Sequence, residues 1–143
     1  MEMNHRELAK TSFNHCWDLL EAPERSEEDQ RNLVGAAMTS RFHWRLAGGL
    51  QEWIIADWMV ARAAGSAHFG AVAVQFALAA EGARTDELPD WLHASTAEGV
   101  ARAYRDAGDL ERMNEWLEVA RRRIEDISDP DDAALIASQV AEL

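Results

Sequence analysis

Hydrophobic residues recur every three or four positions along most of the chain, and polar or charged residues lie between them. One regular stretch consists of Leu110, Met113, Leu117, Ala120 and Ile124, which share one face of a helix. Good helix formers such as Ala, Leu, Arg and Glu dominate, and β-branched residues never alternate with polar ones over the length of a strand. The pattern predicts an all-α protein.

Prolines and glycines interrupt this pattern and mark the expected helix ends. The three prolines fall where a helix should begin or end, since proline breaks a helix interior but is tolerated in the first turn: Pro23, Pro89 and Pro130. Gly48 and Gly49 form a break, and Gly65 is expected to end a helix by adopting a left-handed backbone. We expect helices over about residues 4–21, 26–47, 50–64, 67–83, 90–107, 109–127 and 130–142.

Short connections between these helices predict antiparallel hairpins. The hairpins should cover about residues 4–47, 50–83 and 90–127, and a shorter helix at 130–142 should follow them. A chain of 143 residues can bury about two-thirds of its surface, so we expect a single domain, 1–143.

Charge narrows the range of partners. The chain has 14 Lys and Arg against 26 Asp and Glu, a formal net charge of −12. This charge repels nucleic-acid phosphates and anionic lipid headgroups, so neither is an expected partner. No uncharged stretch is apolar enough to span a bilayer, residues 1–10 lack the pattern of a secretory signal, and Cys16 is the single cysteine. The sequence therefore predicts a soluble, cytoplasmic protein.

Two of the expected hairpins share one spacing. The residues of one are Ala101, Tyr104, Gly108, Met113, Leu117 and Ala120, and the same offsets in the other give Trp58, Ala61, Gly65, Gly70, Val74 and Ala77. This internal repeat resembles the tetratricopeptide-repeat (TPR) family, although Gly65 and Gly108 are 43 residues apart and the family repeat has 34. The resemblance implies a short right-handed solenoid of about six long helices, closed by a capping helix at 130–142.

The same resemblance implies a binding groove. In that family the first helix of each hairpin lines a concave groove that binds extended peptides or partner helices. The matching groove candidates are His15, Asp18, Glu52, Ile55, Met59, Arg62, Ser95, Glu98, Arg102 and Arg105. Ile55 and Met59 stand where the family's carboxylate clamp has Lys and Asn, so a clamp of that kind is not expected.

The arginines of this candidate groove have two interpretations. Arg62, Arg102 and Arg105 would form a local positive site in an acidic protein, and the planar guanidinium group suits carboxylates. Alternatively, they are solvated helix-face residues paired along their own helix, as Glu98 with Arg102 would be.

A second candidate cluster surrounds the glycine break at residues 48–49. It consists of Arg41, His43, Trp44 and Asp57, with Glu52 and Trp53 nearby. Asp57 falls on the apolar face of its helix, so we expect it to pair with Arg41 or His43. Such a cluster either ties two helices together or handles protons.

No cofactor or metal site is expected, because no two of the five histidines have a metal-ligand spacing on a helix. A site built from His15, His43 and a carboxylate is left open. The six tryptophans either fill the core or anchor a ligand: Trp17, Trp44, Trp53, Trp58, Trp91 and Trp116.

The absence of a catalytic motif favours a non-catalytic module that binds a protein or peptide partner in the groove. The alternative is a small-molecule-binding or enzymatic helical domain that uses the cluster around Asp57. Self-association through the apolar stretch at residues 63–80 is compatible with either function.

Overall fold

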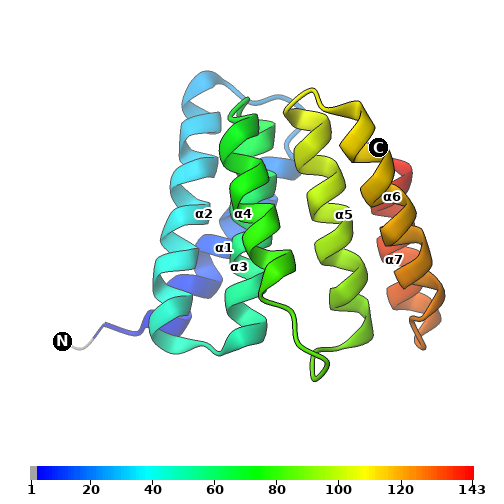
Figure 1. Ribbon diagram of the computed structural model, residues 1–143. Coiled ribbons are helices and arrows are strands. Elements are labelled where there is room, and N and C mark those ends of the chain that lie inside the picture. The colour runs from blue at the N-terminus through cyan, green and yellow to red at the C-terminus, as the bar shows by residue number, and fades with distance from the viewer. Residues whose placement is uncertain (1–2) are drawn as a thin grey trace.

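The protein is described by a computed structural model that covers residues 3–143. Within that range the chain forms seven α-helices and no strand, which confirms the predicted all-α class. The helices lie alongside one another (Figure 1). They are α1 (His5–Glu21), α2 (Glu27–Ala47), α3 (Leu50–Ser66), α4 (Gly70–Gly82), α5 (Asp90–Asp106), α6 (Leu110–Glu125) and α7 (Pro130–Ala141).

Local sequence explains where several helices begin. Before α2, the Ser26 hydroxyl accepts a hydrogen bond from the backbone N–H of Asp29, and the Asp29 carboxylate accepts one from the Ser26 N–H. This reciprocal capping box satisfies two donors that the first turn leaves free. The side chains of Asp109 and Asp129 cap α6 and α7, and Pro130 is the first residue of α7.

The turn between α3 and α4 differs from the prediction. Gly65 does not end α3, which continues to Ser66, and His68 is the residue with a left-handed backbone, at φ 70°. Gly65 is buried instead, and a Cβ there would collide with the carboxylate of Asp106 on α5. The missing side chain at Gly65 leaves room for Asp106, a residue of a helix distant in sequence. Gly108, at the matching position of the other hairpin, does have a left-handed backbone, at φ 82°.

The helices form two rows. Each helix packs against the next along the chain, and α1, α3, α5 and α7 also contact one another in that order. Across residues 3–143, no comparable contacts join α2, α4 and α6 to each other. The odd-numbered helices therefore form a continuous inner row, while the even-numbered helices are spread along the outside (Figure 1). This packing is consistent with a helical repeat.

Small residues let the inner helices approach closely. In α3 and α5, Ala63, Ala94, Ala97 and Ala101 are completely buried, and an alanine leaves little side chain between two helix backbones. Of the apolar stretch at residues 63–80, Phe69 and Leu78 are exposed. None of the helices described over residues 3–143 combines the length and the hydropathy needed to cross a bilayer.

Cys16 is buried in α1 and should be chemically inert in the folded protein. Burial raises the pKa of its thiol to about 12. Because the thiolate is the reactive species, we expect native protein at about pH 8 not to react with Ellman's reagent, and the same sample in guanidinium chloride to react with one equivalent. Rapid reaction of the native protein would contradict this burial.

Candidate binding groove

A cavity of about 300 Å³ opens between α1 and α7, with α3 and α5 beneath it. All four helices of the inner row contribute to its wall. The lining residues are Phe13, Ile55, Trp58, Trp91, Leu92, Ser95, Leu135, Ile136 and Gln139. The wall is almost entirely apolar, and three of its side chains are aromatic.

Trp58 of α3 is fixed in the floor of the cavity. Its indole N–H lies 3.1 Å from the backbone oxygen of Ser95 and 3.3 Å from the Glu98 carboxylate, both of which can accept its hydrogen. The ring lies against Gly99, where an added Cβ would be only 2.6 Å from Cδ1 of the indole. The absent side chain at Gly99 therefore lets the edge of the indole ring approach α5 closely.

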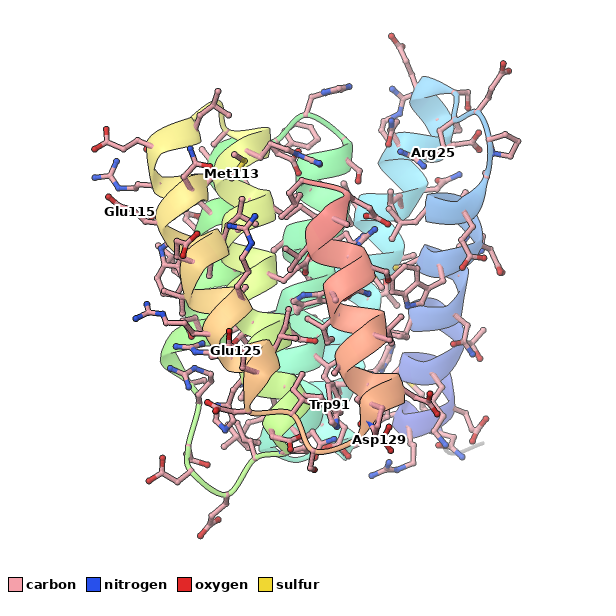
Figure 2. The ribbon with its side chains drawn as sticks, turned by 90° about the vertical axis from the view of Figure 1, so that its right-hand side faces the viewer. Arg25, Trp91, Met113, Glu115, Glu125 and Asp129 are labelled. Atoms are coloured by element: carbon pink, nitrogen blue, oxygen red, sulfur yellow. The ribbon has the colours of Figure 1, made fainter. Side chains whose placement is uncertain are left out.

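The far wall of the cavity comes from α7. Figure 2 looks onto this helix and labels Trp91 close to Asp129, the residue that caps the start of α7. Trp91 packs with Ile136 beside the cavity. Leu135 is 57% exposed at the rim, so an apolar residue on the wall remains accessible to a partner.

The groove has a polar end beyond Trp58. Arg62, Arg102 and Arg105, which we call the arginine cluster, converge there on Glu142, the residue that follows α7. Arg102 donates to the Glu142 carboxylate at 2.8 Å and to the backbone oxygen of Gln139 at 3.2 Å. Arg105 also binds Asp106.

Glu98 anchors this polar end from within the core. Its side chain is completely buried and accepts a hydrogen bond of 2.7 Å from Arg102. Burial alone lowers the pKa of Arg102, but the carboxylates of Glu98 and Glu142 outweigh burial and leave that pKa raised. The expected pairing of Glu98 with Arg102 is present, and it is buried rather than solvated.

Two buried polar atoms at this end lack a hydrogen-bond partner: Nη1 of Arg62 and Oε1 of Gln139. The Arg62 guanidinium lies over the rings of Trp17 and Trp58, at 5.2 and 5.7 Å from their centroids. Burial, and then repulsion by Arg102, lowers the pKa of Arg62. Because buried polar groups are usually paired, these two atoms have unused hydrogen-bonding capacity beside the groove.

The other groove candidates from the sequence lie apart from the cavity or form part of its wall. Ile55 lines the cavity, but Met59 is fully buried between helices and is inaccessible to a ligand. His15 and Asp18 are exposed on α1. Glu52 lies at the start of α3, where its carboxylate accepts a hydrogen bond from the backbone N–H of Gly49 at 3.3 Å.

Sequence reasoning missed the contribution of α7. It treated residues 130–142 as a cap, so Leu135, Ile136 and Gln139 were not among the candidates, and neither was Phe13, while Trp91 was considered only as one of six tryptophans that either fill the core or anchor a ligand. The one available signal was Leu135, an apolar residue next to Ile136 in a short helix that cannot bury both on one face.

The cluster around Asp57 joins α2 to α3. The expected pair of Asp57 and Arg41 is present at 2.5 Å, and Arg45 binds the other Asp57 oxygen at 3.2 Å. His43 contacts His5 instead, with the two Nδ1 atoms 2.9 Å apart. Trp44 is buried, and its backbone oxygen accepts a hydrogen bond from the indole of Trp53.

The described residues offer no obvious metal chemistry. Among residues 3–143, no three side chains of His, Cys, Asp or Glu gather closely enough to hold a metal ion. Comparisons of this chain with protein-family models, curated proteins and solved structures found no match. Its function must therefore be argued from the groove itself.

Proposed function

We propose that this protein is a non-catalytic binding module, and that the cavity between α1 and α7 takes an apolar side chain of a peptide or protein partner. In this proposal the two rows of helices form a short, right-handed, TPR-like solenoid, and the inner row lines its concave side. A cytoplasmic location belongs to the same proposal, because the single cysteine has no partner within the chain.

The observation that carries the proposal is an apolar cavity of about 300 Å³ whose wall includes the accessible residue Leu135. Apolar cavities with a few polar groups are the usual form of a ligand site. Aromatic and aliphatic side chains around a pocket also match the anchor sites that contribute most to peptide binding. Trp58 and Trp91 supply such rings here.

The alternative function, chemistry at the Asp57 cluster, has less support. Both Asp57 oxygens bind arginines, and the side chain is only 5% exposed. A carboxylate that binds one arginine through each oxygen ties α2 to α3, and its burial keeps a substrate away from it. The cluster is therefore best explained as a structural tie.

A selection from random peptides displayed on phage tests the proposed function. We expect the wild-type protein to enrich peptides with a large apolar residue, and Leu135→Arg to weaken their binding at least tenfold, because a charged side chain at the rim blocks an apolar anchor. Affinities of synthetic copies of the enriched peptides would be measured by isothermal titration calorimetry.

Leu110→Arg is the matched control. Leu110 is also 57% exposed, but it lies at the start of α6 and does not line the cavity. This variant should bind the selected peptides like the wild type. Equal loss of affinity in both variants, or full affinity in Leu135→Arg, would contradict binding in the groove.

A further inference from the structure

A carboxylate already lies in the polar end of the groove, and the protein itself supplies it. Oε2 of Glu142 accepts a hydrogen bond of 2.8 Å from Arg102 but is 3.6 Å from Nη2 of Arg62. The second distance allows electrostatic attraction but is too long for a good hydrogen bond. One carboxylate is thus shared by two guanidinium groups and satisfies only one of them.

Arg62 is held ready for a second acceptor. Its guanidinium lies over two indole rings, and its side chain is 13% exposed. Stacking on aromatic rings fixes the plane of the guanidinium while leaving its edge free to donate. Nη1 has no partner on that edge. A carboxylate that takes the place of Glu142 beside Arg62 would receive charge-assisted hydrogen bonds in a largely desolvated setting.

Glu142 is a weak occupant of this position. Its side chain is 53% exposed, and it caps the C-terminal end of α7. The carbonyl groups at a helix C-terminus repel negative charge. Displacing the Glu142 carboxylate takes it away from two largely buried arginines, and a peptide carboxylate that binds the same guanidinium groups offsets that cost.

We propose that the arginine cluster binds an acidic side chain of the partner peptide, which displaces Glu142, while an apolar side chain of that peptide fills the cavity. This inference rests on the proposed function and names the chemistry of its ligand. The charges are complementary, because Arg62 and Arg102 regain a carboxylate when Glu142 leaves.

Gln139 adds a hydrogen-bonding group that favours a peptide as the ligand. Its Oε1 is a buried acceptor without a donor, and its side chain lines the cavity. A peptide backbone brings N–H donors next to its side chains, whereas a hydrocarbon chain with a carboxylate brings none. The cavity, the arginine cluster and Gln139 thus match one peptide segment. Gln139 would accept a hydrogen bond from the peptide backbone between the apolar and the acidic anchor.

The separation of the two anchor sites sets the spacing in the peptide. Ile55 at the cavity and Arg62 at the polar end are seven residues apart on α3, a rise of about 10 Å. A peptide in the polyproline II conformation has three residues per turn and rises about 3.1 Å per residue, so side chains three positions apart lie on one face, about 9 Å from each other. We therefore expect the ligand to carry an acidic residue three positions from its apolar anchor.

Two pools of fluorescein-labelled decapeptides test this inference. Each peptide has a fixed Trp, one fixed residue three positions before it and one three positions after it, and random residues elsewhere. The two flanking fixed residues are Glu in the first pool, the Glu pool, and Gln in the second, the Gln pool. Binding to purified full-length protein is followed by fluorescence anisotropy. We expect the Glu pool to bind wild type about tenfold more tightly than the Gln pool, as a gained charge-assisted hydrogen bond implies.

Single substitutions test two points separately: whether the arginine cluster recognises the Glu side chain of the peptide, and whether that side chain competes with Glu142. Glu142→Gln should raise the affinity for the Glu pool several-fold and leave the Gln pool unchanged, because it removes the internal competitor. Arg62→Gln should abolish the preference for Glu. Arg112→Gln is the matched control, since Arg112 is an exposed arginine of α6 paired with Asp109.

Results that contradict the acidic anchor, the displacement of Glu142 or the proposed function differ from one another. Equal binding of the two pools to wild type, lost in Leu135→Arg, would overturn the acidic anchor and leave the proposed function intact. Weaker binding of the Glu pool to Glu142→Gln would overturn the displacement. Binding of neither pool would count against the proposed function itself. Because Glu142 is an exposed residue after the last helix, its variant tests the inference even where Arg62→Gln fails to fold.

Discussion

Glu98→Leu is expected to lower the free energy of unfolding by about 3 kcal/mol, at the lower end of the range for breaking a buried ion pair. Glu98 is completely buried, and its removal leaves Arg102 without its main partner inside the protein. The Trp58 indole also loses one of its two acceptors. The decrease in the free energy of unfolding stays at the lower end of that range because Arg102 keeps its contacts with α7 and Glu142. Chemical unfolding followed by tryptophan fluorescence measures this change.

The double variant Glu98→Leu/Arg102→Leu provides the control. Replacing a whole buried ion pair by apolar residues is often close to neutral, whereas removing one partner is costly. We therefore expect the double variant to be more stable than Glu98→Leu alone. A double variant less stable than the single one would mean that Arg102 stabilises the fold through its contacts with α7 rather than through Glu98.

Met59→Ala is expected to destabilise the protein by about 2–5 kcal/mol, the usual cost of truncating a large buried apolar side chain. Met59 is completely buried and belongs to a cluster with Cys16, Leu33 and Trp58. The truncation leaves a void that these neighbours fill only in part. The midpoint of urea unfolding should shift accordingly, with an unchanged dependence on denaturant concentration.

Ile55→Ala is the variant to compare with Met59→Ala, because Ile55 lines the groove whereas Met59 belongs to the core. Ile55 lies one turn before Met59 on the same helix but lines the cavity, so its truncation should cost less stability. Its effect on peptide binding should be the larger of the two, because it removes part of the anchor site. If Met59→Ala folds normally and loses peptide binding selectively, the burial of Met59 would be contradicted.

The helices could be predicted because their determinants are local. The apolar spacing in α6, the capping box at Ser26 and the proline at the start of α7 each act within a few residues. The exception is Gly65, where the local pattern favoured a helix end. A contact with Asp106 of α5 explains that glycine, and a pattern of neighbouring residues contains no information about such a contact.

The candidate site was only partly predictable. Arg62, Arg102 and Ile55 were found because the resemblance to the TPR family nominated groove positions on the first helix of each hairpin. A partner for Asp57, either Arg41 or His43, was expected from the cost of an unpaired buried charge. Whether a helix face meets another helix or an open groove cannot be inferred from periodicity. Met59 follows Ile55 by one helical turn, yet one side chain is core and the other faces the cavity.

The sequence by itself determined an acidic, all-α chain with helix ends set by caps, prolines and glycines, because periodicity and capping are short-range effects. Tertiary structure alone decided that α7 would form a wall of the cavity, that Glu98 would be buried beneath Arg102, and that Glu142 would reach the arginine cluster. These features join residues as distant as Phe13 and Gln139. Their positions follow from how the inner helices pack side by side, and the free energy of that packing comes from contacts between helices rather than from preferences within each one.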